Sequence, residues 1–235
     1  MEGYYAVEKR RPVRETAAEK LSRETAEFFA GLIRMAVLSL ILTPVLLAAF
    51  LTVDIPMRLF DGFVGTDLAV RPSNWLSRGG MLIALTPLIA ILFARRVGGD
   101  EASRAITASW GVAAIAVMAE LTYLAPALEA GDFPTVRFSM VFVASAMAAQ
   151  YVAVGVYDVA RGGQNWWRAA LYGALGGYIA YGLIYFPGIY FGVGAPWLNW
   201  MIGDMAIKAV LAFLFVPVYG MLRRPLKPTR GFGGI

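Results

Sequence analysis

Three charged residues, Glu120, Asp204 and Lys208, interrupt long apolar stretches of the sequence. A charged side chain in an apolar interior is costly, so it needs a partner or a function. Asp204 and Lys208 are four residues apart, so on a helix they project from the same face. Two interpretations follow: a mutual ion pair that faces the interior, or two side chains that line a polar cavity and hold a substrate or a proton.

Uncharged polar residues add to this set. Gln150 lies in the fourth apolar stretch, where it can bridge helices by hydrogen bonds or form hydrogen bonds with the edge of a polar ring in a ligand. The fifth stretch is rich in Gly and Tyr, Tyr181 included. Gly173 and Gly177 form a small-xxx-small pair, which favours close helix contact. A cavity lined by Tyr hydroxyls and rings is the alternative, and the two can coexist.

The absence of Cys and His excludes several kinds of site at once. Zinc, haem and iron–sulfur ligation, disulfides, and catalytic triads built on His or Cys all need these residues. The sequence also lacks a phosphate-binding loop and paired catalytic carboxylates. We therefore expect no catalytic residue, metal or cofactor; an enzyme with Glu120 or Asp204 as a lone acid or base is the least favoured class. Because the basic segments are not interleaved with aromatics, we expect no nucleic-acid partner.

The composition identifies the environment of these residues. The 235-residue chain is 59% apolar and 16% charged, against about 45–50% and 25% in soluble domains. Its apolar runs are near the ~20 residues that cross a bilayer, and they do not alternate as barrel strands do. We predict an all-α integral membrane protein, a bundle of six transmembrane helices, with these runs: 35–53, 79–94, 105–126, 137–157, 169–191 and 200–222. The second run is short, and an extension back through Trp75 would lengthen it.

The chain divides into an amphipathic segment (1–34), the membrane domain (35–222) and a basic tail (223–235). In the first segment, Thr16 and Glu19 have the spacing of a capping box, which predicts a helix start. This segment is interpreted as a short juxtamembrane helix on the lipid headgroups or as a docking arm for a partner protein.

The loops carry two further signals. The connection 54–78 is long enough for a short interfacial helix. Trp197 and Trp200 follow the fifth run, where Trp is typical of an interfacial anchor and, alternatively, can stack on a planar ligand. Arg137 and Asp158, at the ends of the fourth run, are expected to reach the interface.

The order of residues in the carboxyl half resembles the queuosine precursor transporter family, also called the vitamin uptake transporter (VUT) family. The match covers roughly 137–222 and rests on these residues: Gln150, Tyr157, Asp158, Arg161, Trp166, Trp167, Trp197, Asp204, Lys208 and the run Pro217-Val218-Tyr219-Gly220.

The resemblance implies a bacterial inner-membrane importer of 7-deazaguanine bases, with a fold similar to the substrate-binding components of energy-coupling-factor transporters. The partners would be the bilayer and a small planar solute. The substrate-binding positions carried over are Gln150, Trp166, Trp167, Asp204 and Lys208. Tyr181 or Trp200 would supply an aromatic lid.

Three acidic positions of the family are absent. This chain has Ala94, Ala153 and Tyr181 where members usually carry acidic residues. Removal of such groups costs specific affinity, so the solute can differ or transport can be lost. The alternative function is therefore a non-transporting accessory subunit of a membrane complex, which contacts other subunits through its amino-terminal segment and outer helix faces.

The Lys and Arg residues predict the orientation. Sixteen of the 21 fall in the two terminal segments and in the loops after the second and fourth runs, and four fall in the other loops. Because cytoplasmic segments are enriched in Lys and Arg, both ends are predicted to be cytoplasmic. Tags fused to each end should be accessible only from the cytoplasmic side, and ends on opposite sides would contradict six spans.

Overall fold

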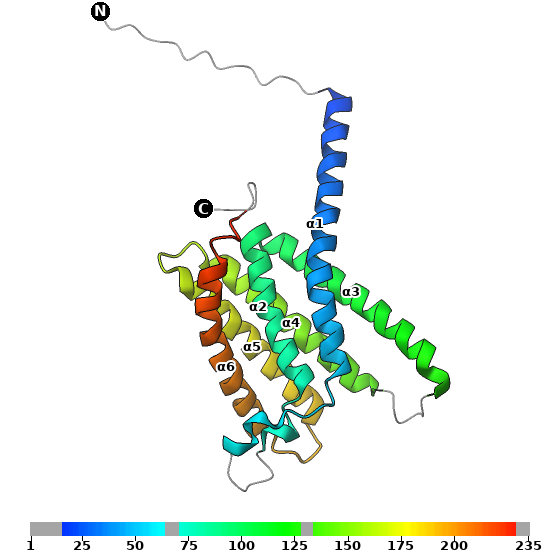
Figure 1. Ribbon diagram of the computed structural model, residues 1–235, viewed down its shortest axis with the longest axis vertical. Helices are drawn as coiled ribbons and strands as arrows, with labels where there is room; N and C mark the ends of the chain where they lie inside the picture. Colours follow the sequence, from blue (N-terminus) through cyan, green and yellow to red (C-terminus); the bar gives the residue numbers. More distant parts are fainter. Residues whose placement is uncertain (1–15, 64–70, 128–133, 229–235) are drawn as a thin grey trace, which may run out of the picture. The chain divides into compact units, whose positions relative to one another are not determined.

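The computed structural model describes residues 16–63, 71–127 and 134–228. The six long helices are α1 (Ala17–Leu51), α2 (Arg78–Val97), α3 (Gly99–Leu124), α4 (Val136–Ala160), α5 (Trp166–Tyr190) and α6 (Trp197–Leu222) (Figure 1). The described parts of the connections contain three short 3-10 helices: η1 (Arg58–Phe63), η3 (Pro72–Asn74) and η4 (Ala125–Ala127). Each long helix is long and apolar enough to cross a membrane. The prediction of a helical chain with six such segments is confirmed.

The chain separates into two compact units, Met1–Arg34 and Met35–Ile235. In the first unit, the side chain of Glu19 accepts hydrogen bonds from the backbone N–H and the hydroxyl of Thr16, both at 2.9 Å, and the Thr16 hydroxyl accepts from the backbone N–H of Glu19 at 3.3 Å. The predicted capping box is confirmed. The helix that begins there is not short as expected, because α1 continues without a break to Leu51. No Pro lies in α1 before Pro44 to interrupt the hydrogen bonds between successive turns.

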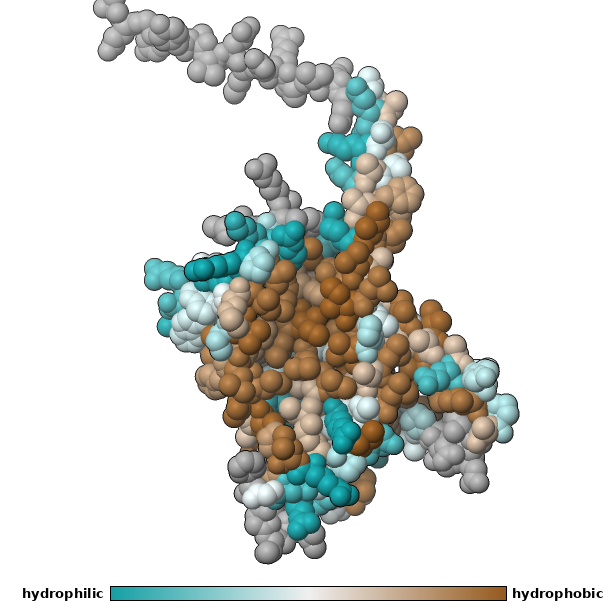
Figure 2. Space-filling view, in the orientation of Figure 1, coloured by the Kyte–Doolittle hydropathy of each residue, from teal (hydrophilic) through white to brown (hydrophobic). Residues whose placement is uncertain are grey.

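In the second unit, α2 and α5 are the most buried of the helices. α5 packs against α4 and α6, and α2 packs against α3, α4 and α5. α1, α3 and α6 keep more of their surface exposed. Figure 2 shows apolar side chains over the helix faces of this unit, with polar groups gathered toward the two ends of the bundle. This distribution is the one expected for helices in a hydrocarbon layer.

The contact between α4 and α5 is made by glycines. A Cβ on Gly177 would lie 2.6 Å from the carbonyl oxygen of Ala149, and one on Gly173 would lie 2.8 Å from that of Ala153. Real Cβ atoms do not approach so closely, so only glycine fits at both positions. The predicted small-xxx-small contact is confirmed.

In its described residues, the connection from α1 to α2 contains two short 3-10 helices, η1 and η3. The backbone N–H of Ser73 donates to the Asp61 carboxylate at 3.0 Å, which ties the two turns together. The second span does not extend back through Trp75, because Trp75 closes η3 and Ser77 caps α2 by accepting from the N–H of Gly80 at 2.9 Å. The Trp75 ring packs against Gly203 of α6 instead.

Arg137 and Asp158 at the ends of α4 both have protein partners. The guanidinium of Arg137 donates to the carbonyl oxygens of Gly188 at 2.8 Å and Phe191 at 3.1 Å, which satisfies groups at the end of α5. Asp158 forms an ion pair with Arg161 at 3.2 Å and lies against Gly99, the first residue of α3. The positive end of the α3 dipole stabilises a carboxylate at this position.

Gly177→Ala is expected to lower the free energy of unfolding of the detergent-solubilised protein by about 1–3 kcal/mol, because the methyl group would force α4 and α5 apart. Thermal unfolding measures the effect. Gly176→Ala is the matched control: its Cβ would meet Val156 at an ordinary 3.4 Å, and alanine favours the helix. Equal losses of stability in both variants would contradict the close contact.

Candidate functional site

Asp204 and Lys208 form an ion pair inside the second unit. The Lys208 ammonium donates to the Asp204 carboxylate at 2.6 Å, and the two residues are 3% and 1% exposed. Their spacing of four residues on α6 places them one turn apart on its inner face. Of the two interpretations of the sequence, the structure shows the mutual ion pair.

The ion pair lies at the end of a series of aromatic rings between α5 and α6. Lys208 Nζ lies 3.7 Å from the centre of the Tyr181 ring, a short cation–π contact. Tyr181 stacks on Tyr185, with ring centres 5.0 Å apart and an interplanar angle of 16°. Tyr185 contacts Tyr190, which meets Trp200 edge to face at 5.1 Å. We call Tyr181, Tyr185, Tyr190 and Trp200 the aromatic track.

The aromatic track leads from the interior toward one end of the bundle. Tyr181 and Tyr185 are buried, whereas Tyr190 and Trp200 are half-buried at the end of α5 and in the first turn of α6. Lys208 is eleven residues from the start of α6, or about 16 Å along its axis. The charged pair therefore lies near mid-span, with stacking surfaces between it and that end.

Gln150 belongs to a different polar cluster. Its side-chain oxygen accepts from the Trp110 indole N–H at 2.9 Å, and its amide group donates to the Thr86 hydroxyl at 2.8 Å. Thr86 in turn donates to the carbonyl of Ile83 at 2.8 Å. Gln150 thus bridges α4 to α2 and α3, as one of its two interpretations required, and neither of these hydrogen bonds involves Asp204 or Lys208.

Trp166 and Trp167 lie at the start of α5, at the opposite end of the bundle from Trp200. Trp166 stacks on Tyr219 with ring centres 6.2 Å apart, and the Arg223 guanidinium lies 5.2 Å from the Trp166 ring. The Arg168 guanidinium lies 5.5 Å from the ring of Trp167. Fifteen residues separate Trp166 from Tyr181 on α5, about 22 Å along the helix. The structure does not bring these two Trp residues to the ion pair.

Glu120 is exposed near the end of α3, so it is not part of an interior site.

The sequence pattern indicated Tyr181 as a site residue, but not Tyr185, Tyr190, Thr86 or Trp110. Tyr178, Tyr181 and Tyr185 have helical spacing, and that pattern was the available signal for Tyr185. Thr86 and Trp110 join Gln150 only through the fold. In the described part of the chain, no group of three or more acidic side chains is placed to hold a metal ion.

This arrangement offers stacking rings beside one cation and one anion, which suits a planar solute with both hydrogen-bond donors and acceptors. Comparison of the chain with protein-family models, curated proteins and solved structures gives no match.

Lys208→Met is expected to destabilise the protein by about 3 kcal/mol, because it leaves the buried Asp204 carboxylate without its partner. The double variant Asp204→Asn/Lys208→Met should regain most of that loss, since neither charge remains. Unfolding of the four proteins in a double-mutant cycle measures the coupling. Additive losses would show that the two groups do not stabilise each other.

Proposed function

We propose that this protein is a membrane carrier that binds a small planar polar solute between α5 and α6 and transports it inward by alternating exposure of that site. The observation that supports the proposal is the buried Asp204–Lys208 ion pair at the inner end of the aromatic track. The proposed location is a bacterial inner membrane, with both ends of the chain in the cytoplasm and the Trp200 end of the track outward.

An ion pair in a span is a poor device for stability alone. Desolvation of two charges offsets most of their attraction, and apolar residues of similar volume stabilise a fold as well or better. Intramembrane charges therefore indicate a functional site by default. In the proposed carrier, the solute adds hydrogen bonds to Asp204 and Lys208 while its ring stacks on Tyr181.

The sequence resemblance to the queuosine precursor transporters covers α4, α5 and α6, and so includes both helices of this site. On that basis the proposed solute class is the 7-deazaguanine bases or a similar vitamin-like heterocycle. The proposed fold relationship is to the substrate-binding components of energy-coupling-factor transporters. The family carries acidic residues at three positions where this chain has none. Among the described residues of the six long helices, Asp204 is the buried carboxylate.

Uptake of labelled 7-deazaguanine bases and related planar heterocycles, in cells that lack other importers, tests the proposal. Expression of this chain should confer uptake. Tyr181→Ala should lower it roughly tenfold, the order expected for one lost stacking contact. Tyr172→Ala is the matched control, because Tyr172 is on the same helix and 47% exposed. Absence of uptake for the whole panel, or equal effects of the two variants, would contradict the proposed carrier.

A second candidate is an accessory subunit of a membrane complex. It is favoured by the amino-terminal part of α1, where Phe28, Phe29 and Ile33 are exposed within their own unit. Exposed aromatic and aliphatic groups of this kind are typical of interaction sites.

Purification in a mild detergent separates the two candidates. A stoichiometric partner that is lost in a Phe28→Ser/Phe29→Ser variant would support the subunit. Migration of the chain without any partner would contradict it.

A further inference from the structure

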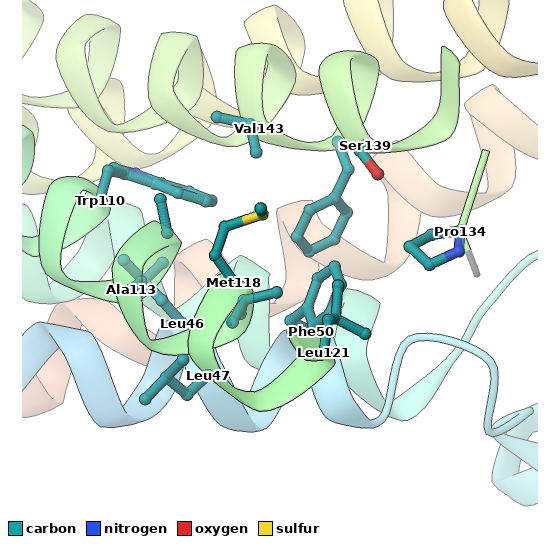
Figure 3. A pocket seen from close by; sticks show the side chains of 13 residues that line it. Leu46, Leu47, Phe50, Trp110, Ala113, Met118, Leu121, Pro134, Ser139 and Val143 are labelled. Carbon is teal, nitrogen blue, oxygen red and sulfur yellow. The ribbon is translucent and has the colours of Figure 1, made fainter. Parts of the chain in front are cut away.

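An apolar cavity of about 230 Å³ lies between α1, α3 and α4 in the second unit. Figure 3 shows side chains of the three helices around it. Leu46, Leu47 and Phe50 come from α1. Trp110, Met118 and Leu121 line it from α3, and Phe142 and Val143 from α4. This cavity is separate from the ion pair and the aromatic track, whose residues do not line it.

The cavity is held open by rings that are fixed in place. The indole N–H of Trp110 donates to Gln150 at 2.9 Å, which sets the orientation of the ring. Phe142 meets Trp110 edge to face at 6.5 Å and Phe50 at 6.3 Å, and it stacks on Phe138 at 5.8 Å. A wall of interlocked aromatics cannot relax into the space as flexible side chains would.

The size and chemistry of the cavity restrict what can fill it. Apart from the Ser139 hydroxyl, its lining side chains are apolar. An apolar cavity of ~150 Å³ holds a benzene molecule, so this one has room for a chain end or a single ring. A helix, at about 10–12 Å in diameter, does not fit. Water would find too few hydrogen-bond partners there.

We propose that this cavity binds the end of one lipid acyl chain. Its three helices are all long and apolar enough to be membrane spans, so hydrocarbon is the surrounding medium. Met118 and Val143, which line the cavity, are 64% and 36% exposed. They give it an open side through which a chain enters from the lipid layer. The bound chain fills the space between α1, α3 and α4 and contacts the Trp110 ring.

Photolabelling of the full chain in phosphatidylcholine vesicles tests this proposal. The probe is a small fraction of phosphatidylcholine with a diazirine in its acyl chain, and peptides are mapped after irradiation. Labelling is expected at Ala113 and Phe142, which are 5% and 1% exposed and lie out of reach of surrounding lipid. Val112 and Ile115 are exposed on the outside of α3, so their labelling measures contact with the surrounding lipid. Labelling of the outward residues alone would overturn the proposal.

Ala114→Phe, from the exposed side of the lining, is the blocking variant. It should abolish labelling at Ala113 and Phe142 while labelling of outward residues persists. Ala119→Phe is the matched control, an exposed alanine of α3 outside the cavity. Should Ala114→Phe fail to fold, Val143→Phe blocks from the opposite wall, with the exposed Val159→Phe of α4 as its control. Unchanged labelling in a folded blocking variant would overturn the proposal.

A second copy of the chain is the competing occupant. The chain has no Cys, so Met118→Cys introduces a single thiol beside the cavity. If the cavity is filled by lipid, oxidation in vesicles leaves this variant monomeric. Efficient formation of disulfide-linked dimers would overturn the proposal and assign the cavity to a contact with a second copy of the chain.

Discussion

The close approach of α4 and α5 is the constraint on which the rest of the bundle depends. Gly173 and Gly177 leave α5 without side chains on one face, and the backbone of α4 occupies that space. At this separation neither helix can rotate or slide without a clash. Two polar groups lie beside this contact: Gln150 of α4 contacts α2 and α3, and Tyr181 of α5 contacts Lys208 on α6.

Each side of this contact has its own polar cluster, and the two clusters differ in what they leave available. Gln150 uses both its oxygen and its amide group to join Trp110 and Thr86, so it acts as a fixed bridge. Gln150 is a neutral amide, whereas the Asp204 carboxylate and the Lys208 ammonium make stronger, charge-assisted hydrogen bonds and have further acceptor and donor sites. In the proposed carrier, this difference favours the α5–α6 side for the solute.

Local patterns predicted the parts of the structure that depend on local interactions. Apolar runs predicted the six long apolar helices, the Thr16–Glu19 spacing predicted the start of α1, and the Gly173–Gly177 spacing predicted the α4–α5 contact. The partners of Gln150 and Trp166 could not be predicted, because they depend on which helices meet and in what register. The shortness of the second run suggests an extension back through Trp75, but the turn that Pro72 begins ends there.

Of the positions at which the resemblance to the queuosine precursor transporters would expect a carboxylate, Ala153 lies at the same contact. Ala153 is fully buried, and a Cβ on Gly177 would lie 3.1 Å from its methyl group. A carboxylate at position 153 would have to separate α4 from α5, and so would disturb both glycine contacts. Ala94 is also fully buried, where a carboxylate would lie in a tightly packed interior. With these positions closed by packing, the proposed recognition of a solute rests on Asp204, Lys208 and the rings that lead to them.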